Sequence, residues 1–178
     1  MKQTRIRQLT VAALIAAMYA TVTLVFPILS YGAIQCRLAE ALTILPVFSP
    51  VALPGLAIGC AVSNLIGLGM GANPAGAWDV LLGPLTTLAA AFISYALRGI
   101  KTKGFPLLST LPPVLLNAVV IGAELTLVSP NPVWPLFWFN FATVAIGQFL
   151  ACVIGGFLLH LALNKSGMAG RLFQFSKI

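Results

Sequence analysis

Long apolar segments, separated by short clusters of Pro, Gly and charged residues, make up almost the whole chain. The apolar segments lie near residues 8–27, 36–49, 51–69, 78–98, 111–129 and 139–163. A membrane-spanning helix needs about 20 mostly apolar residues, so the pattern predicts a bundle of membrane-spanning helices. Segment 36–49 is short and contains Pro46, which favours a short or broken helix there. Residues 1–178 are expected to form one membrane-embedded domain.

Composition strengthens this interpretation, because the chain is 60% hydrophobic and 7% charged, with a mean hydropathy of +1.02. Ordinary soluble domains carry roughly 25% charged residues, so a soluble globule is excluded. The net charge of +7 lies in clusters that flank the apolar segments, which favours an anionic membrane surface over nucleic acid. Cys36, Cys60 and Cys152 are isolated, so neither a disulfide framework, nor a metal site, nor a cofactor is expected.

The basic residues predict how the helices cross the membrane. Nine of the ten form three clusters outside the apolar segments: Lys2, Arg5 and Arg7; Arg98, Lys101 and Lys103; and Lys165, Arg171 and Lys177. Lys and Arg accumulate in cytoplasmic loops, so the chain must cross an even number of times between successive clusters. The expected fold is an all-α, compact bundle of six transmembrane helices with both termini in the cytoplasm. Loops near 28–36, 70–77 and 130–138 then lie outside, where they can close over a ligand.

Four charged residues lie away from those clusters. Arg37, Glu40, Asp79 and Glu124 fall at the outer ends of the second, fourth and fifth segments. Charges in a membrane span are costly and usually face a cavity or a partner, so we expect them to line a pocket that opens to the outside. Taken singly, Arg37 and Glu40 can form a structural ion pair, and Asp79 can stabilise a helix start. Together they sum to −2, which favours a cationic or hydrogen-bond-donating solute.

Further polar and aromatic residues are expected on the same outer side. Asn140 lies near the outer end of its segment and is a candidate member of the site. Tyr31 and Trp138 belong to a group of outer aromatic residues that usually form a belt at the lipid headgroups. A planar heterocycle would nevertheless stack well on one or two such rings.

Small residues recur every four positions in three segments. Ala12, Ala16 and Ala20 form one such stripe, which can pack within the bundle or dock a partner protein. The other stripes are expected to pack within the bundle, and they consist of Gly55, Gly59, Ser63 and Gly67, and of Gly147, Ala151 and Gly155.

Motifs for enzymatic chemistry are missing from the sequence. It contains no phosphate-binding loop of the form G-x-x-x-x-G-K-[ST], no H-E-x-x-H and no G-x-S-x-G. We therefore expect no catalytic residues and no ATP hydrolysis by this chain itself.

One stretch resembles a known family. The segment from Gln35 to Leu42 reads Q-C-R-L-A-E-A-L, and Ile44-Leu45-Pro46, Pro54-Gly55, Trp78-Asp79, Gly83-Pro84 and Thr87-Leu88-Ala89-Ala90 follow it. These motifs resemble the QueT family, and the resemblance extends over nearly the whole chain. QueT proteins are the substrate-binding S components of energy-coupling factor (ECF) transporters in the bacterial cell membrane, and they are associated with queuosine precursors.

The resemblance implies partners and a substrate. The chain would bind a 7-deazaguanine base from outside, such as 7-aminomethyl-7-deazaguanine or queuine. It would dock on a transmembrane coupling protein, the T component, which carries two ATPase subunits. The face of Ala12, Ala16 and Ala20 matches the stripe by which S components meet that protein. Chemistry suggests that Glu124 or Glu40 reads the guanine edge while Asp79 holds the amine.

Three alternatives stay open from the sequence. The chain could be an S component for another vitamin-like heterocycle. It could instead be a self-sufficient transporter that couples protons through Glu124. Finally, it could be a membrane scaffold whose buried charges bind no ligand.

Overall fold

The computed structural model describes residues 2–32 and 35–173, and every element named in this part of the chain is a helix. Lys177, predicted to belong to the third basic cluster, lies outside the described residues. The elements are α1 (Lys2–Val25), α2 (Pro27–Tyr31), the 3-10 helix η1 (Leu38–Val47), α3 (Ala52–Gly69), α4 (Ala77–Ala96), the 3-10 helices η2 (Leu97–Gly99) and η3 (Leu107–Thr110), α5 (Leu111–Leu127), α6 (Trp134–Gln148), the π-helix η4 (Phe149–Gly155), α7 (Gly156–Lys165) and α8 (Met168–Phe173).

Five helices of the described chain are long and apolar enough to cross a membrane. They cover Gln3–Val25, Ala52–Gly69, Ala77–Gly99, Leu107–Leu127 and Trp134–Lys165. The last begins five residues before the predicted start at residue 139, because Trp134-Pro135 opens α6 instead of preceding it. Proline is well tolerated in the first turn of a helix, where its missing N–H has no helical partner to lose.

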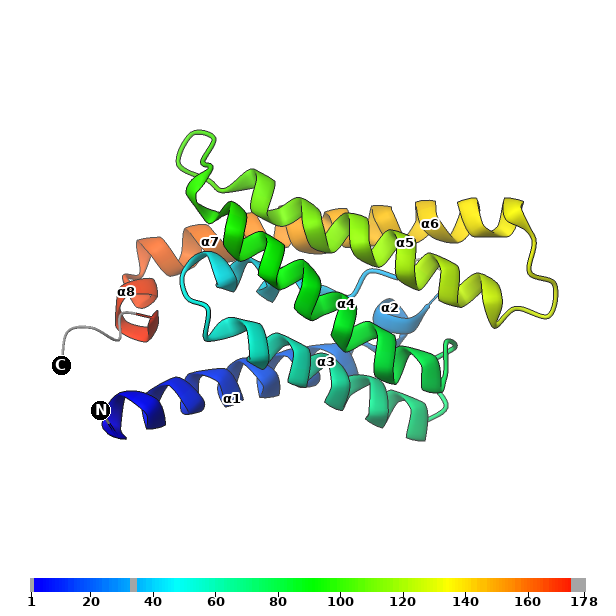
Figure 1. Ribbon diagram of the computed structural model, residues 1–178, viewed down its shortest axis with the longest axis horizontal. Coiled ribbons are helices and arrows are strands. Elements are labelled where there is room, and N and C mark those ends of the chain that lie inside the picture. Colours follow the sequence, from blue (N-terminus) through cyan, green and yellow to red (C-terminus); the bar gives the residue numbers. More distant parts are fainter. Residues whose placement is uncertain (1, 33–34, 174–178) are drawn as a thin grey trace.

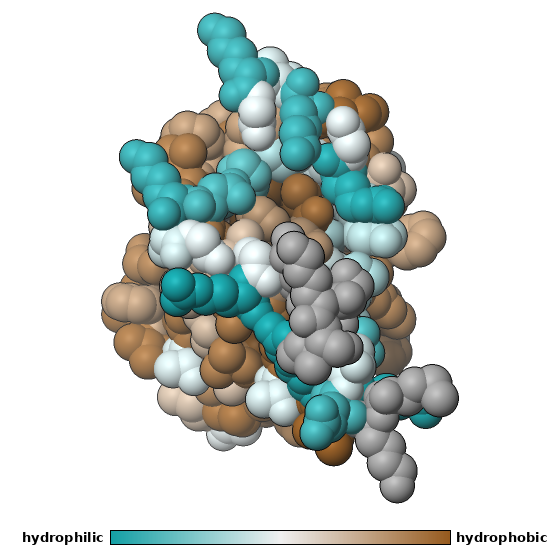
Figure 2. Space-filling model, turned by 90° about the vertical axis from the view of Figure 1, so that its left-hand side faces the viewer, coloured by the Kyte–Doolittle hydropathy of each residue, from teal (hydrophilic) through white to brown (hydrophobic). Residues whose placement is uncertain are grey.

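The helices run lengthwise through an elongated bundle (Figure 1). The start of α1, the connection between α4 and α5, and α8 lie at one end, which we call the basic end. Hydrophilic residues gather on this end and apolar ones surround it (Figure 2). Arg7 donates a hydrogen bond to the carbonyl of Arg171 and so ties α1 to α8 there. The short helix α2 and the 70–76 and 128–133 connections lie at the opposite end.

Helix η1 occupies the middle of the bundle. It has ten residues, Pro46 lies inside it, and Ala39, Glu40 and Ile44 are each about 1% exposed. At about 2.0 Å of rise per residue, a 3-10 helix of this length covers roughly 20 Å, less than the roughly 30 Å of a bilayer core. The prediction of a short helix in segment 36–49 is therefore confirmed, although not as an α-helix.

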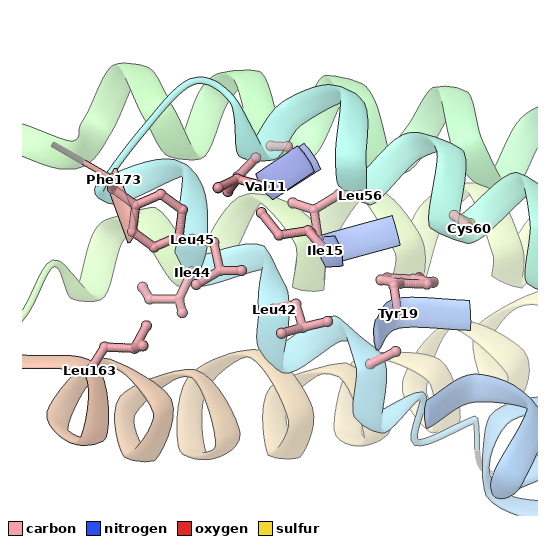
Figure 3. Packing of buried hydrophobic residues seen from close by; sticks show 13 residues of the cluster. Val11, Ile15, Tyr19, Leu42, Ile44, Leu45, Leu56, Cys60, Leu163 and Phe173 are labelled. Atoms are coloured by element: carbon pink, nitrogen blue, oxygen red, sulfur yellow. The ribbon is translucent and has the colours of Figure 1, made fainter. Parts of the chain in front are cut away.

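The apolar core joins η1 to its neighbours. Side chains from α1, η1 and α3 point toward one another in Figure 3, with Leu163 and Phe173 nearer the basic end. Large apolar side chains also cover the outside of the bundle, where Leu9 is 70%, Leu81 61% and Leu158 60% exposed. An outer surface this apolar fits contact with lipid.

Small residues let α1 and α3 approach closely. A Cβ atom added to Gly59 would lie 2.7 Å from Tyr19 Cβ and 2.8 Å from the Ala16 carbonyl oxygen. One added to Gly55 would lie 2.7 Å from the Ala12 carbonyl oxygen. The third-segment stripe therefore packs within the bundle, as predicted. Its counterpart on α1 is the stripe predicted to dock a partner, and its residues Ala12 and Ala16 face α3 rather than open lipid.

The sixth-segment stripe positions the start of η1. A Cβ atom added to Gly147 would overlap the Gln35 backbone, and one added to Gly155 would lie 3.0 Å from Ala41 Cβ. Only glycine at position 147 lets the chain from Gln35 to Arg37 pass this close to α6. The predicted packing role of this stripe is confirmed, and it fixes where Arg37 enters the bundle.

Gly59→Ala tests the packing of α1 against α3. We expect the free energy of unfolding to fall by about 1–3 kcal/mol, because the new methyl group would overlap the Ala16 carbonyl oxygen and the helices α1 and α3 would have to move apart. The control is Gly69→Ala, whose Cβ would meet no atom of the described chain within 4 Å. Unfolding of the detergent-solubilised variants measures the difference, and equal stability for the two would contradict this packing.

Candidate functional site

A buried ion pair joins η1 to α4. Arg37 immediately precedes η1, Asp79 lies in the first turn of α4, and Arg37 Nη2 is 3.1 Å from Asp79 Oδ2. Arg37 is 4% exposed and Asp79 1% exposed. The structure pairs Arg37 with Asp79 and not with Glu40, the pairing that sequence spacing allowed as an alternative. Arg37 has extended backbone angles, φ −76° and ψ 92°, so helical spacing does not place its side chain over Glu40.

Aromatic and sulfur atoms surround the Arg37 guanidinium. Its carbon lies 5.4 Å from the centre of the Tyr31 ring, and Nη1 lies 3.6 Å from Cys60 Sγ. The Tyr31 hydroxyl donates to the Ser63 carbonyl at 2.9 Å. Tyr31, predicted to stack on a substrate, thus stacks on the cation of the site itself, a favourable contact for a guanidinium.

Asp79 is held by two asparagines. Asn73 Nδ2 donates to Asp79 Oδ2 at 2.9 Å, and Asn64 Nδ2 donates to the Asp79 carbonyl at 2.7 Å. Asp79 is not the N-cap of α4, which is Gly76, but it lies in the first turn, where a carboxylate interacts favourably with the positive end of the helix dipole, as the alternative role at a helix start expected. Gly83 makes room for this arrangement, since an added Cβ would collide with Asp79 Oδ1 and Asn64 Nδ2.

Glu40 is anchored from α1. The Tyr19 hydroxyl donates a hydrogen bond to Glu40 Oε1, and both residues are at most 1% exposed. Within the described chain, neither Glu40 Oε2 nor Asn117 Nδ2 makes a hydrogen bond of normal geometry, although the Asn117 amide lies close enough to Glu40 to act on it as a donor. The charges of Arg37 and Asp79 also act on Glu40, so the carboxylate belongs to the same cluster.

Glu124 completes the cluster from the last turn of α5. It is 4% exposed, and neither carboxylate oxygen has a hydrogen-bond partner among residues 2–32 and 35–173. Asp79 and Arg37 act on it electrostatically, which places it near the ion pair. Burying an unpaired carboxylate is expensive, so its presence here calls for a function.

Arg37 and Asp79 meet in the ion pair, and the electrostatic influence of both on Glu40 and Glu124 indicates that the four displaced charges lie in one region, although they do not line an open pocket. Arg37, Glu40, Asp79 and Glu124 are each at most 4% exposed. Tyr31, the last residue of α2, contacts Arg37, and Asn73, in the connection between α3 and α4, contacts Asp79. We call Arg37, Glu40, Asp79 and Glu124 the carboxylate cluster.

Open hydrogen-bond acceptors dominate the carboxylate cluster. In the part of the chain that the structure describes, the buried carboxylate and amide oxygens without a partner are Glu40 Oε2, Asp79 Oδ1, Asn64 Oδ1, Glu124 Oε1 and Glu124 Oε2, and the hydroxyl oxygens of Thr87, Ser94 and Ser109 also lack one. Among the same residues, no group of three or more His, Cys, Asp or Glu side chains is arranged to hold a metal ion. The site can therefore accept hydrogen bonds from N–H groups and balance a positive charge.

Two further predicted site residues, Asn140 and Trp138, make other contacts in the structure. Asn140 Nδ2 donates to Thr126 Oγ1 at 3.1 Å and so bonds α6 to α5. Trp138 is 60% exposed and packs edge-on against Phe137 and Phe141, as expected for a lipid-facing ring. Near them, a groove of about 770 Å³ between α5 and α6 has an almost wholly apolar lining that includes none of the carboxylates.

Sequence reasoning missed several members of the cluster. Tyr19 carries a usable signal, because a tyrosine in the middle of an apolar helix needs a partner for its hydroxyl. Asn64 and Asn117 are amides inside apolar segments, which marks them as polar but not as neighbours of Asp79 and Glu40. Asn73 lies among turn residues and carries no distinguishing signal.

Comparison with known proteins gives consistent matches. The family described as QueT transporter matches residues 9–165. The "Queuosine precursor transporter QueT" of Lactococcus lactis subsp. cremoris (strain MG1363) is 26% identical over 172 residues, which cover 89% of this chain and 94% of that protein. No solved structure matches the chain.

Asp79→Asn tests the ion pair. The variant leaves the Arg37 cation buried without its bonded anion, so we expect unfolding to become easier by about 3 kcal/mol. The double variant Arg37→Gln/Asp79→Asn removes both charges and should recover a large part of that loss. Denaturant unfolding of the ligand-free protein measures both effects. A double variant no more stable than Asp79→Asn would show that the two side chains are not coupled.

Proposed function

Because this chain belongs to the QueT family of transporters, we propose that it is the membrane-embedded substrate-binding subunit of an ECF transporter for a queuosine precursor. As a family member it is a multi-pass membrane protein and a transport protein rather than an enzyme. The name of the Lactococcus relative supports the substrate class. The observation that carries the proposal is the buried carboxylate cluster with its unpartnered oxygens.

The chemistry of the cluster suits a 7-deazaguanine base. The amidine-like edge of the guanine ring presents neighbouring N–H donors, and an aminomethyl substituent adds a cation. Glu40, Asp79 and Glu124 supply acceptors and, with Arg37, a summed charge of −2. An anionic solute would meet repulsion there, whereas a donor-rich cation would replace the hydrogen bonds that these oxygens lack.

Roles follow from which oxygens are already used. Asp79 Oδ2 is occupied by Arg37 and Asn73, which leaves Oδ1 to hold an ammonium group. Both oxygens of Glu124 are open, so this side chain can accept two parallel N–H bonds from the guanine edge. Glu40 offers only Oε2, because Tyr19 holds the other oxygen.

For a substrate to reach the carboxylate cluster, the segments that carry Tyr31 and Asn73 must move away from it. Tyr31 contacts Arg37 from the end of the short helix α2, and Asn73 contacts Asp79 from the connection between α3 and α4. We infer that six passes, counting η1 as one, place these segments outside and both termini in the cytoplasm. The shared position of the basic clusters at one end supports this orientation. When these two segments close again over a bound substrate, they would shield the site from water.

Energy would come from partner proteins. The sequence has no phosphate-binding loop, so ATP hydrolysis is assigned to two ATPase subunits that act through a transmembrane coupling protein. In the stripe expected to dock that protein, Ala12 and Ala16 are partly buried where their backbone approaches Gly55 and Gly59 of α3, and Ala20 is buried. Beside it on α1, Ala13, Ala17 and Thr21 are exposed and keep the four-residue spacing. We assign the docking face to these three residues.

The decisive experiment combines binding with transport. Purified chain should bind 7-aminomethyl-7-deazaguanine or queuine more tightly than flavin or thiamine. Uptake into cells should require the coupling protein and ATPases in addition to this chain. Uptake into liposomes by the chain alone, driven by a pH gradient, would instead favour a proton-coupled transporter. Tight binding of another heterocycle would show that the proposed substrate is wrong but would leave the proposed transport mechanism in place.

Glu124→Gln tests the substrate role of the unpartnered carboxylate. We expect binding to weaken by about 1.5–3 kcal/mol, or roughly 10-fold to 150-fold in Kd, because a charge-assisted hydrogen bond is lost. The ligand-free variant should be as stable as the parent or more so, because a costly buried charge has gone. Calorimetric titration and unfolding measure the two effects. Unchanged affinity would remove Glu124 from the site.

Ala17→Leu tests the docking face. The larger side chain should impair uptake and co-purification with the coupling protein while substrate affinity stays within about twofold, since Ala17 is exposed and lies on α1. Ala89→Leu is the matched control, because it makes the same change at an exposed position on α4. If both variants transport normally, the assigned face is wrong.

A further inference from the structure

A second hollow lies at the basic end, far along the bundle from the carboxylate cluster. It has a volume of about 850 Å³, within the range of ligand pockets. The end of η1, the connection between α4 and α5, α7 and α8 all contribute to it. Its lining consists of Val47, Phe48, Arg98, Gly99, Lys101, Gly104, His160, Asn164, Ala169, Gly170 and Phe173.

The charge of the hollow is positive and uncompensated. Arg98 and Lys101 contribute two cations, and none of the described lining residues is acidic. All three acidic side chains of the sequence belong to the carboxylate cluster instead. The hollow is also mainly polar in its exposed surface, unlike the apolar groove between α5 and α6.

Arg98 is oriented by its neighbours. Its Nη1 donates to the Tyr95 carbonyl at 2.8 Å, and its guanidinium carbon lies 3.8 Å from the centre of the Tyr95 ring. A guanidinium has five N–H donors, so this contact leaves others for an anion. The side chain is therefore partly fixed before any ligand binds, which lowers the entropy cost of binding.

His160 and Asn164 form the polar back wall. His160 is 8% exposed and lies between Phe48 and Phe105, with ring centres 5.3 Å away in each case. Asn164 Nδ2 is 3.2 Å from the imidazole nitrogens, and the Lys101 charge acts on the same ring. These contacts hold polar groups in fixed positions next to the two cations.

An apolar surface continues from the hollow along α7. Phe105, which contacts His160, also packs edge-on against Phe157 at 5.0 Å between ring centres. Phe157 is 40% and Leu158 60% exposed on α7. The hollow lies where the apolar helices end, at the depth of lipid headgroups, so a bound molecule can place a polar group inside and apolar chains along α7.

We propose that this hollow binds the phosphate headgroup of an anionic phospholipid, with Arg98 and Lys101 holding the phosphate and acyl chains lying against Phe157 and Leu158. Basic hollows between membrane helices are suited to such headgroups, and charge-assisted bonds to phosphate are strong. A bound lipid would tie the α4–α5 connection to α7 and α8. This inference does not depend on the nature of the transported solute.

The test measures phospholipid binding by the full-length chain. The chain in phosphatidylcholine micelles is titrated with a fluorescent phosphatidylglycerol. We expect Lys101→Gln to weaken binding about fivefold, and Arg98→Gln by a similar factor, because each removes one cation near the phosphate. Lys165→Gln is the matched control, since Lys165 is exposed at the same end but does not line the hollow. It should bind like the parent, and melting temperatures establish that the variants are folded.

Three results would overturn the proposal. Equal losses for Lys101→Gln and Lys165→Gln would mean that general charge attraction, not the hollow, holds the lipid. Equal affinity for labelled phosphatidylcholine would show that the anionic headgroup is not recognised. Displacement of the lipid by millimolar inorganic phosphate would identify a free phosphate as the ligand instead.

Discussion

The buried ion pair between Arg37 and Asp79 is the interaction on which the site depends. It joins residues 42 positions apart and connects the start of η1 to the start of α4 at 3.1 Å. Two buried charges away from water are tolerable only when they are paired and further hydrogen-bonded. Asn73 donates a hydrogen bond to Asp79, and the Tyr31 ring stacks on the Arg37 guanidinium, so both contacts stabilise the pair and cover it.

The carboxylates of Glu40 and Glu124 are buried without a full set of hydrogen-bond partners. Glu40 keeps one open oxygen and Glu124 keeps two, measured against the residues that the structure describes. A fold selected only for stability would replace such groups by apolar ones, because their desolvation is not repaid. Stability given up in this way is typical of binding sites, where the missing hydrogen bonds are left for a ligand.

Close helix packing makes this arrangement possible. Glycines on α3 let α1 approach closely, which brings Tyr19 to Glu40. Gly147 on α6 lets the segment that carries Arg37 pass close to that helix. The same bundle gathers hydrophilic residues at the basic end, whereas Asp79 and Glu124 lie at the ends of α4 and α5 that point away from it (Figure 1 and Figure 2). Helix α1 contacts the carboxylate cluster through Tyr19 and faces lipid through Ala17, so one rigid element reaches both the site and the proposed docking face.

The sequence alone determined the membrane class, the helical fold and the family, because hydropathy, charge clusters and the Q-x-R-x-A-E-A-L segment are local properties of the chain. It also singled out Arg37, Glu40, Asp79 and Glu124, since charges inside apolar segments are conspicuous wherever they point. Only the tertiary structure decided how they combine. The extended backbone at Arg37 directs its side chain to Asp79, Tyr19 takes one oxygen of Glu40, and Tyr31 and Asn73 contact the ion pair. Such pairings depend on which helices become neighbours, and sequence spacing within one helix carries no information about that choice.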